Sequence, residues 1–150
     1  MLLKSHLVYS AAAVRRILGL PHHWPVKVEA FADAVWVWIK GRRPTFWPKQ
    51  AFKQHFCHWR QRRAQAVEIT EIRPSHFAAR SVGQTTGSRE SIYFLDARAE
   101  GIFCTCEDFH RQLSAWNRGC CKHCYAVLAH LGFNSLGEYL ALQDQDGWVA

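Results

Sequence analysis

The chain has 150 residues, 49% of them hydrophobic, and a formal net charge of +7 at pH 7. This length and composition suit one globular core, or two small cores of which one is braced by a metal ion. No stretch approaches the roughly twenty apolar residues that cross a bilayer, and no repeat or low-complexity tract is present, so a membrane-spanning, collagen-like or coiled-coil protein is excluded.

Charge is divided unevenly along the chain. Residues 1–64 hold twelve Lys and Arg against only Glu29 and Asp33, whereas residues 65–150 hold seven against ten acids. A positive field of this extent is a common footprint of nucleic-acid binding, because cationic side chains displace counterions from phosphates. We therefore expect two regions, a basic N-terminal module over 1–64 and a second region over 65–150, whether or not they pack as one domain.

The N-terminal module begins with a predicted helix and two predicted strands. Apolar residues recur at helical spacing over Val8–Leu18, and Gly19 to Pro21 ends that helix. Val26–Glu29 and Ala34–Lys40 are rich in β-branched and aromatic residues, which indicates two paired strands. In the second strand the aliphatic side chains share one face and the tryptophans share the other, so we expect both faces to be covered.

A turn over Gly41–Pro44 leads to a predicted helix over Lys49–Arg63. Phe52, Phe56, Trp59 and Arg63 lie on one side of this helix, which gives it an aromatic core side and a basic solvent side. A solvated basic face is one interpretation of these cations, and contact with phosphates is the favoured one. The predicted phosphate contacts are Arg42, Arg43, Lys49, Lys53, Arg60, Arg62 and Arg63.

Four tryptophans of the basic region offer a second kind of contact. Aromatic rings stack on unpaired bases in single-strand binders, and Trp36, Trp38, Trp47 and Trp59 are the candidates. Seven tryptophans in a small protein are explained more economically by packing, so most are expected to lie in the core.

From Ala66 onward the pattern becomes that of strands and ends in a helix. The predicted elements are strands over 67–72, 76–82 and 91–96, a hairpin loop over 83–88 and a final helix over 136–142. Asn134 or Ser135 is expected to cap that helix, and residues 144–150 form an acidic tail.

Two closely spaced pairs of residues that commonly bind metal follow the predicted strand over 91–96. They are Cys104 and Cys106, and Cys121 and His123. Three thiolates and an imidazole suit tetrahedral zinc and leave no position for a catalytic water, which predicts a structural site. Residues two apart in a strand project from one face, and the second pair lies at the start of a predicted helix over 124–131, where backbone N–H groups favour negative charge.

The alternative for these cysteines is buried thiols or disulfides. The start of the chain lacks the pattern of a signal peptide, so we expect a reducing, cytoplasmic environment in which clustered Cys and His bind metal rather than crosslink.

At these residues the chain resembles the SWIM zinc finger. The preceding strand is Ser91–Leu95, the first knuckle is Cys104–Phe109, and the second knuckle is Cys121–Leu128, within a resemblance that covers roughly residues 67–131. The resemblance implies a zinc-stapled β-hairpin followed by a helix, and binding to DNA or to protein partners. It does not choose between these two partners.

The resemblance also bears on which side chains ligate. Only Cys121 gives the C-x-H spacing, although Cys120 is an alternative ligand; Cys124 falls on the apolar stripe of the helix and is expected in the core. His110 and His130 are weaker candidates, expected in solvent. The spacer over 111–119 is expected to be a surface insertion, in which Trp116 and Arg118 are candidate recognition residues.

Taken together, the sequence predicts an α+β protein in which a small basic helix and strand module precedes a zinc-stapled β-hairpin and helix. No Gly-rich phosphate loop, H-E-x-x-H or G-x-S-x-G motif is present, so we expect no enzyme and no small-molecule substrate. The predicted function is a zinc-binding accessory protein that binds nucleic acid, with DNA favoured over RNA. The alternative is a zinc-dependent protein–protein adaptor in DNA repair, recombination or transposition.

Overall fold

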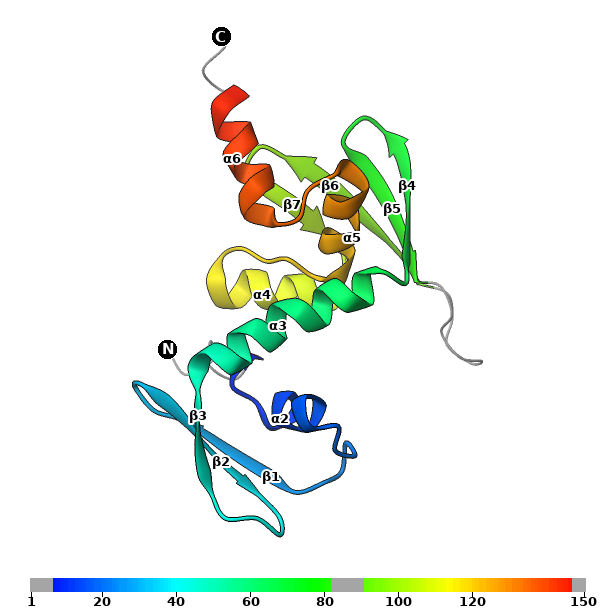
Figure 1. Ribbon diagram of the computed structural model, residues 1–150. Helices are drawn as coiled ribbons and strands as arrows, with labels where there is room; N and C mark the ends of the chain where they lie inside the picture. The colour runs from blue at the N-terminus through cyan, green and yellow to red at the C-terminus, as the bar shows by residue number, and fades with distance from the viewer. Residues whose placement is uncertain (1–6, 82–90, 147–150) are drawn as a thin grey trace. The chain divides into compact units, whose positions relative to one another are not determined.

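A computed structural model describes residues 7–81 and 91–146, and the chain divides into two compact units (Figure 1). The first unit ends at Trp59 and the second begins at Arg60, a boundary that falls inside one helix, α3 (Lys49–Ala64). Each unit contains an antiparallel sheet and helices, which confirms the predicted α+β class. Among the described residues, no helix is both long enough and apolar enough to span a membrane.

The first unit is a three-stranded meander with helices. Helix α2 (Ala11–Leu18) starts at Ser10, whose hydroxyl accepts a hydrogen bond from the Ala13 amide, and ends at Gly19 in a left-handed conformation. Strands β1 (Val26–Ala30), β2 (Ala34–Ile39) and β3 (Thr45–Pro48) pair in sequence order. The predicted pairing of the first two strands is confirmed; β3 was not predicted.

The core of the first unit lies on one face of this sheet. Val35, Val37 and Ile39 alternate along β2 and are all buried, together with Phe52 of α3 and Val14 of α2. The alternation of β2 is therefore as predicted. Its tryptophans project from the opposite face and are only half-buried, so the expectation that both faces are covered holds in part.

The second unit is a four-stranded antiparallel sheet packed against helices. Its strands follow one another in order as β4 (Val67–Arg73), β5 (His76–Ser81), β6 (Ile92–Arg98) and β7 (Gly101–Cys104). Its helices are α4 (Glu107–Trp116), α5 (Lys122–Leu131) and α6 (Leu136–Asp146). Buried Phe77, Leu95 and Ile102 from the sheet meet Val127 and Leu128 from α5 in one core.

Two predictions for this unit are corrected by the structure, and a third lies outside the described residues. The spacer between the metal-binding pairs is not a loop insertion, because most of it is helix α4. Helix α6 runs to Asp146, beyond the predicted end, and Ser135 caps it by accepting a hydrogen bond from the Glu138 amide. The predicted hairpin loop at 83–88 and the last four residues lie outside the described residues.

Candidate metal centre

Four side chains from three elements meet in the core of the second unit. Cys104 is the last residue of β7, Cys106 is the N-cap of α4, Cys121 is the N-cap of α5, and His123 lies in the first turn of α5. All four are buried, and their ligand atoms lie within 4.8 Å of one another. The structure thus brings together the four residues that the sequence predicted as metal ligands.

The spacing of these donors suits a tetrahedral zinc ion. Nδ1 of His123 lies 3.7 Å from Sγ of Cys104 and 3.7 Å from Sγ of Cys121. Zinc bonds of about 2.3 Å to sulfur and about 2.0 Å to nitrogen place tetrahedral S and N ligands about 3.5 Å apart. These two distances are therefore close to those of a tetrahedral zinc site.

Two helices direct their N-termini at this cluster. Sγ of Cys106 accepts a hydrogen bond of 3.4 Å from the Phe109 amide, so this sulfur caps α4, and Cys121 occupies the same position in α5. The positive end of each helix dipole and its unsatisfied N–H groups favour negative charge. Three thiolates on one divalent ion leave a net negative charge, which these helix ends stabilise.

Hydrogen bonds among the four donors shift the pKa values of Cys104, Cys121 and His123. Hydrogen bonds with Cys106 and Cys121 raise the pKa of Cys104, whereas hydrogen bonds with Cys104 and Cys106 lower the pKa of Cys121 to about 7. Burial opposes the charged form of His123, but hydrogen bonds with Cys106 and Cys121 outweigh it and raise its pKa to about 9. Metal binding must displace these protons, because thiolates and a neutral imidazole are the ligating forms.

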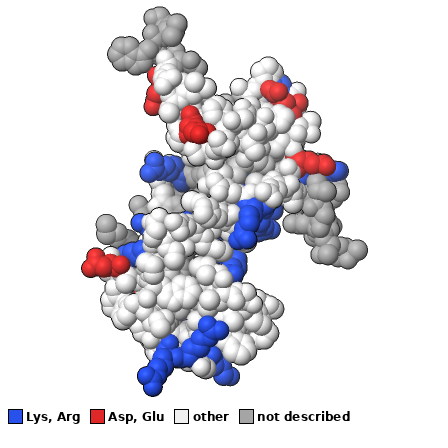
Figure 2. Space-filling model, viewed as in Figure 1, with Lys and Arg blue, Asp and Glu red and all other residues white. Residues whose placement is uncertain are grey.

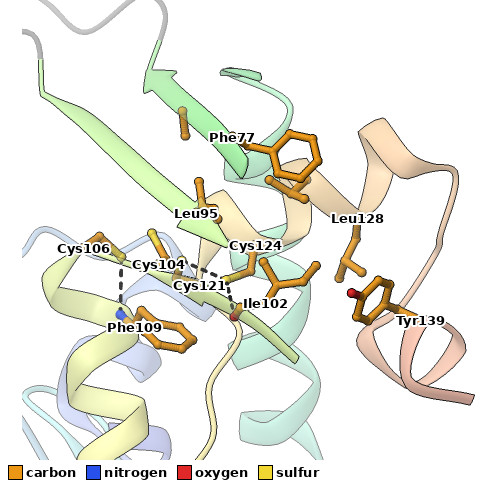
Figure 3. Close-up of a cluster of buried hydrophobic side chains, with 12 residues drawn as sticks. Phe77, Leu95, Ile102, Cys104, Cys106, Phe109, Cys121, Cys124, Leu128 and Tyr139 are labelled. Carbon is orange, nitrogen blue, oxygen red and sulfur yellow. Dashed lines mark hydrogen bonds between the residues drawn. The ribbon is translucent and has the colours of Figure 1, made fainter. Parts of the chain in front are cut away.

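The neighbouring cysteines play other parts. Sγ of Cys124 lies 3.6 Å from Sγ of Cys121 and 3.5 Å from the carbonyl oxygen of Ile102, and Cys124 is fully buried in the core, as predicted (Figure 3). Cys120 is half-buried and does not belong to the four-donor cluster. Figure 3 shows the sulfurs of Cys104, Cys106 and Cys121 side by side next to Phe109.

Packing, rather than a second hydrogen bond, holds the imidazole. Tyr93 lies against His123 with ring centroids 4.7 Å apart, and Nε2 of His123 is buried with no hydrogen-bond partner among the described residues. A ligating histidine commonly donates the N–H of its second ring nitrogen to an acceptor, and the described residues provide no such acceptor for Nε2 of His123. The candidate ligand atom is Nδ1, because this nitrogen faces the sulfurs.

Buried Gln112 links the residues that follow the first metal-binding pair to those that precede the second pair. The side-chain oxygen of Gln112 accepts a hydrogen bond of 2.9 Å from the Cys120 amide, and its nitrogen donates to Oδ2 of Asp108 at 3.2 Å. Gly119 permits this close approach, because a Cβ there would lie 2.9 Å from Cβ of Gln112. Gln112 therefore sets the path of the chain into Cys121.

An ion pair extends this network to α3. Nε and Nη2 of Arg60 donate to both carboxylate oxygens of Asp108, at 2.9 and 2.8 Å. Burial alone would raise the pKa of Asp108, but the hydrogen bond and charge of Arg60 hold that pKa below its usual range. The pair and Gln112 position α4, and with it Cys106, against the end of α3 that begins at Arg60 and belongs to the second unit.

The roles of Asp108 and Gln112 were not predicted, although the sequence contains a signal for their helix. Phe109, Leu113 and Trp116 recur at spacings of four and three, which indicates an amphipathic helix, and Asn117 ends it in the left-handed conformation that asparagine tolerates. Gln112 falls beside this stripe, so its burial follows once the helix is recognised.

The predicted phosphate contacts fall into three groups. Arg42, Arg43, Lys53, Arg62 and Arg63 are exposed. Lys49 is half-buried, with Nζ 5.3 Å from the ring centre of Tyr9. Arg60 does not lie on the solvent side of its helix as expected: it is buried against Asp108, and the reason is an acid 48 residues away that helical periodicity does not reveal.

Other candidates are distributed as follows. Trp47 packs into the core of the first unit, and Trp59 is stacked by His55 and by the guanidinium of Arg16, 4.4 Å from the ring centre. Trp116 is half-buried on α4, and Arg118 is exposed. His110 and His130 lie outside the cluster and are both exposed, as expected.

Comparison with known proteins gives one match. No curated protein and no solved structure matches the chain. Residues 90–132 match the model of the SWIM zinc finger, a span that contains all four donors and ends at the C-cap of α5. The buried Cys₃His cluster and this match both indicate Zn²⁺. Residues 90–132 of this chain are therefore a SWIM zinc finger that binds zinc through a C-x-C and C-x-H cluster.

Proposed function

We propose that this protein is a non-catalytic accessory protein that binds nucleic acid, with DNA favoured over RNA, and that zinc serves its fold. A Cys₃His set uses all four positions of a tetrahedral ion, so the metal has no site for a substrate or a catalytic water. The cluster is buried, in keeping with this role. The family that matches the chain is a zinc finger and not an enzyme family, which suggests a non-catalytic protein.

Exposed cations of the N-terminal region carry the proposal. Between Leu7 and Trp59 the chain has eight Lys and Arg against Glu29 and Asp33. Arg42 and Arg43 are exposed at the turn that follows β2, and Figure 2 shows blue side chains gathered over this turn at the lower end of the view. Long cationic side chains at an exposed turn can reach phosphates and release their counterions.

The first experiment is an anisotropy titration of labelled single-stranded and duplex DNA with zinc-loaded protein at several salt concentrations. We expect log affinity to fall linearly with log salt, because phosphate contacts release counterions. The double variant R42E/R43E should bind more weakly and reduce the magnitude of this slope by about two.

The matched control is Arg73→Glu, which reverses an exposed arginine at the end of β4 in the second unit. This variant should bind nearly as the wild type does. Affinity that is weak at low salt and indifferent to reversal at Arg42 and Arg43 would refute the proposal.

A protein–protein adaptor is the second candidate, favoured by an apolar area in the second unit. Ile92 and Phe94 are exposed on the face of β6 opposite the core. Exposed apolar groups of this size can mark a docking surface. This candidate predicts a stoichiometric complex that survives salt and nuclease treatment, whereas nucleic-acid-mediated association is lost under both.

A further inference from the structure

The outer face of the first unit's sheet presents aromatic side chains instead of polar ones. Trp36 and Trp38 project from β2 on the side opposite its buried aliphatic residues. Phe46 of β3 is paired with Trp36 across the sheet, and Lys27 of β1 is paired with Trp38. Paired residues share a face, so these four side chains lie together on the outer face of the sheet. We call Trp36, Trp38 and Phe46 the aromatic row.

Two phenylalanines of this region are unusually exposed. Phe46 retains 65% of its accessible surface and Phe31 retains 49%. Their rings lie edge to face with centroids 6.0 Å apart. The two rings therefore contact each other at the surface, and a ligand that covered them would remove exposed apolar area from water.

Charge is ordered along the same face. Nζ of Lys27 lies 5.5 Å from the ring centre of Trp38, and Lys40, Arg42 and Arg43 are exposed at the adjoining end of β2. The acids lie toward the other end: Glu29 is paired with Trp36, and Asp33 is in the turn before β2. The Trp38 end of the aromatic row is therefore the one beside cations.

We propose that this face binds single-stranded nucleic acid, with bases stacked on Phe46 and the two tryptophans and with phosphates near Lys27, Arg42 and Arg43. The inference rests on the proposed function and deepens it by naming the ligand class. A duplex hides the faces of its bases inside the helix, whereas an unpaired base can stack on a ring. Side chains two residues apart on a strand are spaced by about 6.7 Å, which leaves room for separate bases on Trp36 and Trp38.

The remaining aromatic residues of this unit are less suited to the role. Trp47 and Phe52 pack against each other in the core, with ring centroids 5.7 Å apart, and Trp59 is covered by Arg16 and His55. The proposed stacking residues are therefore Trp36, Trp38 and Phe46, with Phe31 in contact with Phe46, and not the general tryptophan content of the chain.

The test compares three probes with the zinc-loaded protein: an oligothymidylate of about twenty nucleotides, an abasic strand of the same length, and a duplex. We expect the oligothymidylate to bind tightest. Phe46→Ala should weaken that binding roughly tenfold and leave binding to the abasic strand unchanged, because base stacking on an aromatic side chain is lost while phosphate contacts remain.

The matched control is Phe94→Ala, which removes a similarly exposed phenylalanine from the second unit and should not change affinity. Melting temperatures of both variants verify that each is folded. Equal affinity for the oligothymidylate and the abasic strand would overturn the stacking proposal while leaving phosphate binding intact. Failure of all three probes to bind at low salt would overturn both proposals.

Discussion

Replacing Cys104 with serine is expected to abolish stoichiometric zinc binding and to unfold the second unit. Cys104 ends β7, and its sulfur is buried among those of Cys106 and Cys121 and the imidazole of His123. Structural zinc contributes on the order of 10 kcal/mol in isolated finger peptides, which is comparable to the whole stability of a typical domain, about 5–15 kcal/mol. A hydroxyl does not supply the thiolate that the ion requires.

The measurement is zinc content by native mass spectrometry, together with hydrogen exchange of the amides in 67–81 and 91–146. Cys57→Ser is the matched control, because Cys57 is exposed on α3 and does not belong to the cluster. Cys120→Ser tests the alternative ligand and should retain zinc. One bound zinc ion and unchanged protection in Cys104→Ser would show that the ligand assignment is wrong.

Replacing Asp108 with asparagine is expected to destabilise the second unit by about 2–3 kcal/mol. Asp108 accepts two hydrogen bonds from Arg60, and the two side chains differ in burial: 9% of that of Arg60 is exposed against 39% of that of Asp108. Neutralising the carboxylate removes the counter-charge of the more deeply buried partner. Arg60→Met should cost less, because water can reach the remaining carboxylate.

Urea unfolding of the zinc-loaded variants measures both changes. Glu68→Gln is the matched control, since Glu68 pairs with Arg80 at 3.1 Å with both side chains about half exposed. Exposed pairs contribute at most about 1 kcal/mol, so this variant should be close to the wild type. A cost for Asp108→Asn no larger than that for Glu68→Gln would remove the pair from the account of how α4 is positioned.

Local patterns in the sequence were sufficient for the metal cluster and for part of the fold. Cys104, Cys106, Cys121 and His123 could be predicted together because two pairs of zinc-ligand residue types stand close in the sequence, and the resemblance to the SWIM zinc finger chose Cys121 over Cys120. The expectation that the first pair projects from one strand is wrong, because β7 ends at Cys104 and Cys106 is the N-cap of α4. Strand β2 could also be predicted, because alternation identified Val35, Val37 and Ile39 as the buried face.

Features that depend on distant residues could not be predicted in this way. Strand β3 has four residues, and its pairing with β2 shows only in the fold. Arg60 lies on the polar side of α3 by periodicity, yet it is buried because Asp108 supplies a carboxylate from 48 residues away. Gln112 is buried because the chain at Gly119 and Cys120 packs against it, and Gly119 has no side chain to prevent this approach.

Helix α4 links the metal cluster to a network of hydrogen bonds. Most of the spacer between the two pairs is helix α4, whose N-cap is the metal-binding residue Cys106. Asp108 of this helix bonds to Arg60 of α3, and Gln112 bonds to the backbone of Cys120, just before Cys121. Zinc and this network act on the same elements, so the loss of either should loosen the other.

X-ray absorption at the zinc edge of the wild-type protein counts and identifies the ligands of the bound ion, and it therefore tests directly whether the site is a closed Cys₃His site. We expect three sulfur neighbours at about 2.3 Å and one nitrogen at about 2.0 Å, with no additional oxygen. Four sulfur neighbours would place Cys120 or Cys124 in the ligand set, and an oxygen neighbour would mean an open position at the metal. Either result would contradict a closed structural site formed by Cys104, Cys106, Cys121 and His123.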